Sequence, residues 1–304
     1  MRSARPREDR LTLGVLMMVG AALCFTAIDT SAKWLILAGL PALQVAFARY
    51  AGHFLISLVV FLPNEGLRAF HSNRPVLQFL RGLFLLFSTL LNFVALTYLP
   101  ITLTTTIMFA VPLVVSLLSV PMLGEKVGPR RLSAVGIGFV GVIVAVQPWG
   151  AEFHPAMIFS LGALCCAALY FLLTRMLAGI ESNDTSQLWT SGIATLALFP
   201  FVILHWEWPD TLTGYVVMTV IGLFGIVGHS VANIAHRFAD ASILSPVVYV
   251  QLVYATLAGL LIFGTPPTMW TVVGALIIVG SGIYIWMRER TLARDRTAAN
   301  ISTD

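Results

Sequence analysis

The chain has 304 residues, of which 58% are hydrophobic and only 11% are charged. Soluble domains carry roughly 25% charged residues, so this composition excludes a soluble fold and indicates that the lipid bilayer is the solvent. The net charge of +4 does not indicate a nucleic-acid partner, because the basic residues lie in short connections and tails, as membrane orientation signals do.

Ten apolar segments follow one another along the chain. Each has about 20 residues, enough to cross about 30 Å of hydrocarbon. The connections between them are short and leave no room for an extramembrane domain. The first segment continues to about Leu37, past a signal-peptide core of roughly 7–15 residues, which favours a membrane span over a cleaved signal. The predicted spans are 12–37, 41–62, 76–97, 101–121, 131–148, 155–177, 185–205, 212–235, 241–263 and 268–287.

The two halves of the chain resemble each other. Gly20 to Cys24 resembles Gly162 to Cys166, and Gly82-Leu83-Phe84 is repeated from Gly222. Five spans in each half is an odd number, so the second copy is inverted across the membrane. Inverted repeats are typical of secondary transporters, whose solute site lies near the midplane between the halves. We therefore expect an all-α integral membrane protein with ten transmembrane helices in two inverted five-helix repeats, 11–148 and 155–288, between tails at 1–10 and 289–304.

Basic residues partition to one set of connections, which predicts the orientation. The alternate connections carry acids and no Lys or Arg, whereas four tryptophans (Trp149, Trp206, Trp208 and Trp270) fall at those opposite ends. The positive-inside rule then places both termini in the cytoplasm of a bacterial inner membrane. The basic set is Arg2, Arg5, Arg7, Arg10, Arg68, Arg74, Arg81, Lys126, Arg130, Arg131, Arg175, Arg237, Arg288, Arg290, Arg294 and Arg296.

Each repeat ends in a recognisable pattern. The first reads Ala95-Leu-Thr-Tyr-Leu-Pro100, then Pro112, then Leu123-Gly-Glu-Lys126; the second reads Ala235-His-Arg-Phe-Ala-Asp-Ala241, then Ser245-Pro246, then Leu261-Ile-Phe-Gly-Thr-Pro-Pro267. With Arg49 early in the second span, the chain resembles the EamA family of the drug/metabolite transporter superfamily over residues 11–288.

This resemblance implies ten helices around a cavity lined mainly by spans 1, 3, 4, 6, 8 and 9. It also implies transport of small metabolites: bacterial members export amino acids, and eukaryotic relatives carry sugar phosphates and nucleotide sugars. One departure concerns Thr265, where the family often has an acid, so no coupling role is expected there.

Polar residues inside the spans are costly to bury in lipid and therefore mark the candidate site. Span 1 carries Thr26, Asp29 and Lys33 on one face, with Asp29 in reach of an ion pair with Lys33. Because Asp29 is the one acid well inside a predicted span, it is the candidate for proton coupling. Arg49 and His53 on span 2 either join this site or form a structural charge cluster that holds spans 1 and 2 together.

Spans 3 and 8 are repeat mates with matching polar faces. Ser88 and Asn92 lie four apart on span 3, and His229 and Asn233 lie four apart on span 8. Amide and imidazole groups both donate and accept hydrogen bonds, which suits a zwitterionic or hydroxylated solute. The structural alternative is hydrogen bonding between helices.

Spans 4 and 9 carry the same stripe of two hydroxyls and an aromatic ring, which suggests two facing walls of one cavity. Thr105 and Phe109 correspond to Ser245 and Tyr249. Tyr170 on span 6 adds a ring and a hydroxyl. The structural alternatives are hydroxyls that bond to their own helix and ordinary packing.

These features predict a secondary transporter that exports amino acids and related neutral or zwitterionic metabolites by alternating access. One alternative is an uptake carrier for a vitamin or nucleoside-like metabolite; another, of a different class, is a membrane enzyme or a complex subunit. No catalytic residues, cofactor or metal site are expected, and the three cysteines lie within spans, where no disulfide is expected. The predicted partners are the lipid bilayer and the solute, with the chain as a monomer or a weakly associated homodimer.

Overall fold

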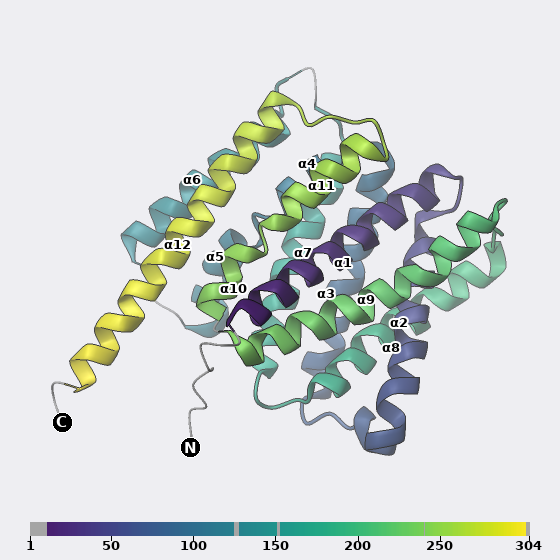
Figure 1. Ribbon diagram of the computed structural model, residues 1–304, viewed down its shortest axis with the longest axis horizontal. Helices are drawn as coiled ribbons and strands as arrows, with labels where there is room; N and C mark the ends of the chain where they lie inside the picture. Colours follow the sequence, from purple (N-terminus) through teal and green to yellow (C-terminus); the bar gives the residue numbers. More distant parts are fainter. Residues whose placement is uncertain (1–10, 125–127, 151–152, 240, 302–304) are drawn as a thin grey trace.

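A computed structural model describes residues 11–124, 128–150, 153–239 and 241–301. All regular structure in these ranges is helical (Figure 1). The helices are α1 (Leu11–Leu37), α2 (Ala42–Glu65), η2 (Gly66–Phe70), α3 (Pro75–Tyr98), α4 (Ile101–Met108), α5 (Val111–Leu123), α6 (Pro129–Val146), α7 (Met157–Leu177), α8 (Asn183–Val202), η3 (Ile203–His205), α9 (Leu212–Phe238), α10 (Ala241–Val247), α11 (Val250–Leu261) and α12 (Met269–Ile301).

Within the described ranges, nine helical segments are long and apolar enough to cross a membrane, and α10 with α11 supplies a tenth crossing. Large apolar side chains cover the outside: Leu55, Val59 and Leu276 are all exposed. Such a surface requires lipid around it, and helices satisfy their backbone polar groups internally. The protein is therefore a multi-pass, all-α membrane protein, as the sequence predicts.

Helix pairing follows an inverted repeat. Helix α1 lies along α9, and α3 lies along α7, while α2 faces α8 and α6 faces α12. In the repeat, α1 corresponds to α7 and α3 to α9, so the first two pairs are the same pair generated twice. The last two pairs each join a helix to its own repeat mate. Both pairs therefore lie on the approximate two-fold axis that relates the two halves.

Small residues allow these helices to approach closely. A Cβ at Gly274 on α12 would lie 2.6 Å from the carbonyl oxygen of Gly141 on α6. At the equivalent point of the same crossing, the Ser281 hydroxyl donates to the carbonyl of Ala134. The spacing that relates Gly82 to Gly222 also relates Gly141 to Ser281 and Ala134 to Gly274, so this crossing is symmetric.

The predicted spans over 101–121 and 241–263 are each made of two helices, and each contains an internal proline, Pro112 or Pro246. Helix α4 ends at Met108, where the ring of Pro112 would clash with the carbonyl four residues earlier and supplies no N–H to it. Both breaks contain a three-residue hydrogen-bond step, from Ala110 to Ile107 (3.0 Å) and from Tyr249 to Pro246 (3.3 Å).

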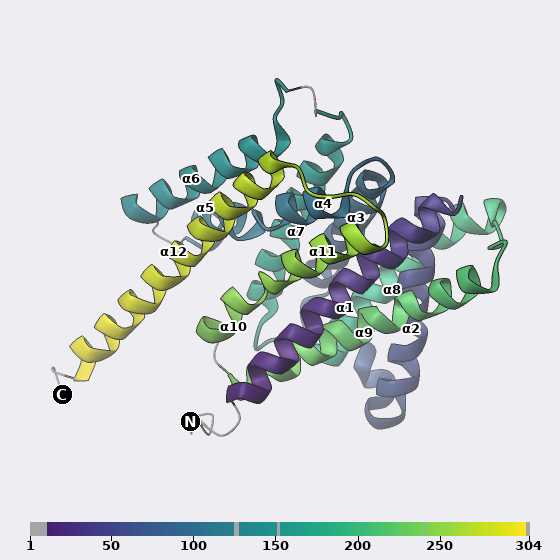
Figure 2. The ribbon, with the colours of Figure 1, turned by 45° about the horizontal axis from the view of Figure 1, so that its top comes forward.

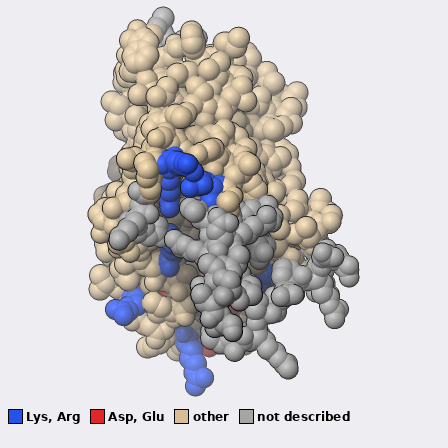
Figure 3. All heavy atoms as spheres, turned by 90° about the vertical axis from the view of Figure 1, so that its left-hand side faces the viewer, with Lys and Arg blue, Asp and Glu red and all other residues tan. Residues whose placement is uncertain are grey.

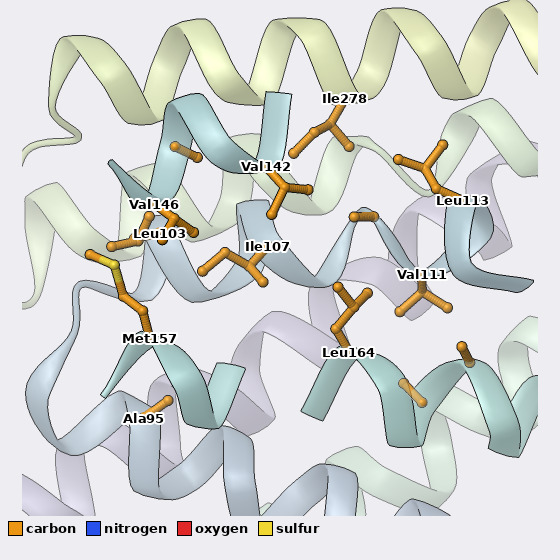
Figure 4. Close-up of a cluster of buried hydrophobic side chains, with 14 of the residues drawn as sticks. Ala95, Leu103, Ile107, Val111, Leu113, Val142, Val146, Met157, Leu164 and Ile278 are labelled. Carbon is orange, nitrogen blue, oxygen red and sulfur yellow. The ribbon is translucent and has the colours of Figure 1, made fainter. Parts of the chain in front are cut away.

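The helix pair α6 and α12 forms one edge of the bundle, and α2, α8 and α9 lie at the other (Figures 1 and 2). Between them, a core of buried apolar side chains joins α4, α5, α6, α7 and α12; Figure 4 shows Leu103, Ile107, Val142, Leu164 and Ile278 pointing into it. This part is apolar throughout and provides the scaffold against which the broken helices rest.

Figure 3 shows several separate groups of Lys and Arg side chains on the face that it presents. Arg68 and Arg175 lie in the last turns of η2 and α7, and Arg288 lies within α12. The predicted tails fall partly outside the described ranges: residues 1–10 and 302–304 are not described, and α12 continues to Ile301.

Candidate functional site

Asp29 and Asn92 meet deep in the bundle, between α1 and α3. The Asn92 amide nitrogen donates to a carboxylate oxygen of Asp29 at 3.2 Å. Asn92 is buried, whereas Asp29 keeps part of its surface open. Arg49 on α2 acts electrostatically on Asp29, although the two described side chains do not form an ion pair. Three helices of the first repeat thus contribute to one polar centre.

Arg49 is held in this centre by neutral groups. One terminal nitrogen donates to the Thr89 hydroxyl at 2.6 Å, and the Tyr50 hydroxyl is also 2.6 Å from the same oxygen. The guanidinium carbon lies 4.8 Å from the centre of the Tyr50 ring. The Arg49 Nε, in contrast, has no hydrogen-bond partner within the described structure. Arg49, interpreted from the sequence as part of the site or of a structural charge cluster, is therefore bound by neutral groups, and its Nε is left unsatisfied.

Lys33 does not pair with Asp29, contrary to the reach that their spacing suggested. Its ammonium group donates to the carbonyls of Leu96 (2.8 Å) and Leu99 (2.6 Å) at the end of α3. Carbonyls at a helix C-terminus lack intrahelical donors and carry partial negative charge, so a cation stabilises them. Lys33 is thus a structural cap for α3.

His229 on α9 brings the second repeat to the same centre. Its ring is 5.1 Å from that of Phe25 on α1 and 6.0 Å from that of His53 on α2. Glycine at position 225 makes room for His53, since a Cβ there would lie 3.2 Å from its Nδ1. His229 is partly open, like Asp29. The centre therefore combines one carboxylate, imidazole rings and an aromatic wall.

Arg81 forms a second polar cluster that the sequence analysis missed. Its guanidinium donates to Thr174 (2.8 Å), Tyr170 (3.2 Å) and Thr190 (2.9 Å), and lies 5.0 Å from the centre of the Tyr170 ring. Proline at position 75 begins α3, so Arg81 lies roughly 9 Å into the membrane-crossing helix at 1.5 Å per residue. Because a proline often marks the first turn of a helix, Pro75 was the signal in the sequence that Arg81 lies inside the helix. The sequence analysis instead grouped Arg81 with the basic residues of the preceding connection.

Phe109 and Tyr249 meet at the two helix breaks. Their ring centres are 5.1 Å apart. The hydroxyl of Tyr249 rests against Gly282 on α12, where any Cβ would overlap it. Because equivalent residues of the two repeats touch each other here, the two-fold axis of the repeat passes between their rings.

The other predicted site residues are more scattered. Thr26 bonds to the carbonyl of Ala22 in its own helix at 3.1 Å, and Ser88 bonds across to the carbonyl of Ala163 on α7 at 3.0 Å. Thr105 is buried on α4. Asn233 is exposed near the basic end and donates to Asn183. Ser245 is on α10, but its side chain lies outside the described residues.

The buried polar groups of the described bundle carry more positive than negative charge. Lys33, Arg49 and Arg81 are 5, 8 and 7% exposed, and their hydrogen-bond partners in the described structure are neutral oxygens. Within the described spans, Asp29 is the one carboxylate away from a helix end. No group of three metal-ligating side chains occurs among the described residues. The arrangement suits reversible binding of a solute that presents acceptors and a ring.

Comparison with known proteins identifies relatives along nearly the whole chain. A riboflavin transporter of Vibrio cholerae is 30% identical and covers 92% of this chain and 95% of its own, and one of Rhizobium johnstonii is 27% identical over 96% of both. An S-adenosylmethionine uptake transporter of Rickettsia prowazekii is 28% identical, covering 83% of this chain and 85% of its own.

A solved crystal structure shares the fold, with a TM-score of 0.62 and 17% identity over 94% of this chain and 99% of the other. The family described as "EamA-like transporter family" matches residues 12–147 and 154–287, one match in each half. The chain therefore belongs to the EamA-like transporter family and is a secondary transporter of small metabolites, not an enzyme.

Proposed function

We propose that this protein takes up riboflavin or a closely similar neutral, planar heterocyclic metabolite by alternating access. The observation that carries this proposal is that two guanidinium groups, Arg49 and Arg81, are buried within the described spans, against the single carboxylate of Asp29. Sparsely compensated cations in a low-dielectric interior favour a ligand rich in hydrogen-bond acceptors.

Charge distinguishes riboflavin from S-adenosylmethionine, the two solutes after which these relatives are named. S-adenosylmethionine carries a sulfonium and an ammonium cation against one carboxylate, so bringing it beside Arg49 and Arg81 would add a repulsive charge. Riboflavin is neutral and presents carbonyl and ring-nitrogen acceptors to the same groups. The greater coverage of the riboflavin transporters also supports this choice.

Aromatic side chains suit a flat ring system. Tyr170 lies beside the Arg81 guanidinium, the rings of Phe25 and His229 pack edge to face, and Phe109 and Tyr249 lie on the repeat axis. Offset stacking on such rings stabilises a planar heterocycle, and a guanidinium group that lies over a ring adds a cation–π interaction. Asn92 adds hydrogen-bonding capacity. We include Thr26, Ser88, Thr105, Asn233 and Ser245 as predicted residues of the wider solute path.

The direction and orientation belong to the same proposal. We place both termini in the cytoplasm of a bacterial inner membrane on the basis of the basic connections. Export of amino acids, the first expectation from the sequence, has less support than uptake of a vitamin-like metabolite, because the relatives reported above are named as riboflavin transporters or S-adenosylmethionine uptake transporters. Asp29 is the proposed coupling residue.

The test is a solute screen with purified protein in liposomes. Labelled riboflavin, S-adenosylmethionine, leucine and phenylalanine are each offered outside, with protein-free liposomes as the baseline. Riboflavin is expected to enter well above the baseline, and excess unlabelled riboflavin to suppress it. Flux of S-adenosylmethionine or of the amino acids, with none of riboflavin, would replace the proposed substrate.

A further inference from the structure

Two buried polar atoms beside Asp29 lack partners and have complementary chemistry. One is Nε of Arg49, a donor; the other is Oδ1 of Asn92, an acceptor. Both side chains are more than nine-tenths buried. An unsatisfied buried donor or acceptor costs roughly 1–3 kcal/mol, so each atom would gain from a partner that arrives with the solute.

The identity of the free Asn92 atom follows from chemistry. An ionised carboxylate only accepts hydrogen bonds, so the amide nitrogen of Asn92 must face Asp29. The amide oxygen is then the atom left without a partner. Arg49, in turn, is always protonated, so its Nε can only donate.

Arg49 reaches from α2 to the part of α3 that carries Asn92. Arg49 is anchored to Thr89, and Thr89 and Asn92 are three residues apart, hence neighbours on the helix surface. Both Arg49 and Asn92 also act on Asp29, one by its charge and one by a hydrogen bond. The donor and the acceptor therefore belong to one polar centre around Asp29.

We propose that Arg49 and Asn92 form a subsite for a lactam or imide edge, in which a ring carbonyl accepts from Arg49 Nε and the adjacent ring N–H donates to Asn92 Oδ1. This rests on the proposed function and assigns the recognised part of the solute. Both atoms are covered in this conformation, so the solute meets them when the repeats part. Asp29 positions the subsite by fixing the Asn92 amide with its oxygen outward.

The ring system of riboflavin carries such an edge, and one methyl group removes its donor. 3-Methylriboflavin keeps the ring carbonyls, the side chain and the neutral charge but has no imide N–H. A site built to hydrogen-bond an N–H rejects an analogue without it, because its own acceptor is left unpaired. Riboflavin is therefore expected to bind purified protein about 10-fold to 1,000-fold more tightly than 3-methylriboflavin.

Variants test which residue discriminates between riboflavin and 3-methylriboflavin. Asn92→Ala removes the acceptor and is expected to bring the ratio of the two dissociation constants to about one, mainly by weakening riboflavin. Thr97→Ala on the same helix is the matched control, because its hydroxyl bonds to the carbonyl of Phe93 in its own helix; it should keep the wild-type ratio. Arg49→Lys removes Nε and should weaken both ligands alike.

Quenching of flavin fluorescence on titration with protein measures both ligands. Equal binding of riboflavin and 3-methylriboflavin by the wild type would overturn the subsite while leaving riboflavin uptake standing. A wild-type ratio that persists in a folded Asn92→Ala variant would overturn the role of Asn92. Failure of riboflavin to bind at all would overturn the proposed function together with the subsite. The wild-type comparison needs no variant to fold.

Discussion

Phe109 and Tyr249 are equivalent residues of the two repeats, and their rings are in contact, with centres 5.1 Å apart. Each lies at the break of its own membrane-crossing segment, between α4 and α5 or between α10 and α11. A contact between symmetry mates must lie on the axis that relates them. We propose that one repeat rocks against the other at this point, with the pair as the pivot.

The first prediction concerns the aromatic ring of Tyr249. Tyr249→Ala removes one half of the axial pair and is expected to lower the rate of solute transport roughly tenfold, the factor that corresponds to about 1.4 kcal/mol. The apolar spans that direct insertion are unchanged, so the amount of protein in the membrane should stay near the wild-type level. Transport in liposomes at equal protein density checks this, and a wild-type rate would remove Tyr249 from the pivot.

A second prediction tests the contact between the Tyr249 hydroxyl and Gly282 on α12. Gly282→Ala would place a methyl group on the Tyr249 hydroxyl, so the ring must move and transport should fall. The matched control is Gly280→Ala, where a Cβ meets nothing within 4 Å.

Removing the hydroxyl should undo the damage. The double variant Gly282→Ala, Tyr249→Phe is expected to recover most of the transport lost in Gly282→Ala, which isolates the interaction as a double-mutant cycle does. The first repeat shows that this combination is acceptable, since there Phe109 is matched with Val142 at the position equivalent to Gly282. Failure of the second change to rescue the first would mean that Gly282 serves another contact.

The third prediction concerns Arg81, which joins α3 of the first repeat to α7 and α8 of the second. Arg81→Lys keeps the charge but loses the planar fork that reaches Thr174, Tyr170 and Thr190 together. We expect a loss of roughly 1–3 kcal/mol in the free energy of unfolding, the scale of hydrogen bonds from a charged group. Thermal unfolding in detergent measures it, with the exposed Arg68→Lys as control; equal stability of both variants would contradict the bridging role.

The fourth prediction concerns coupling through Asp29. Wild-type uptake is expected to increase when a proton gradient is imposed, and Asp29→Asn, which cannot take up a proton on that side chain, is expected to lose the response. Exchange of labelled for unlabelled solute should survive, because exchange needs no net proton movement. An unchanged pH dependence of transport in Asp29→Asn would eliminate Asp29 as the coupling group.

Much of the architecture could be predicted from the sequence because it depends on local composition. Apolar segments of about 20 residues predict the spans, and the repeated Gly82-Leu-Phe motif predicts the inverted halves. The matching stripes that end in Phe109 and Tyr249 predicted two facing walls of one cavity; in the structure these two rings are in direct contact.

The predictions that were wrong concern side chains whose partners are distant in the sequence. Spacing alone suggested that Lys33 pairs with Asp29, but the nearby end of α3 offers it two carbonyls. Arg81, at the start of the predicted span 76–97, was grouped with the basic residues of the preceding connection, and its partners, Thr174 and Thr190, lie in the other repeat. The excess of buried positive charge became visible only once these contacts were known, and it shifts the expected solute from amino acids to an acceptor-rich heterocycle.

The most direct test of the central claim is riboflavin counterflow. Liposomes that contain the purified protein are loaded with unlabelled riboflavin and diluted into a trace of labelled riboflavin. A carrier that alternates around one site is expected to accumulate label transiently inside, above its outside concentration. Accumulation no greater than in protein-free liposomes would contradict riboflavin transport by this protein.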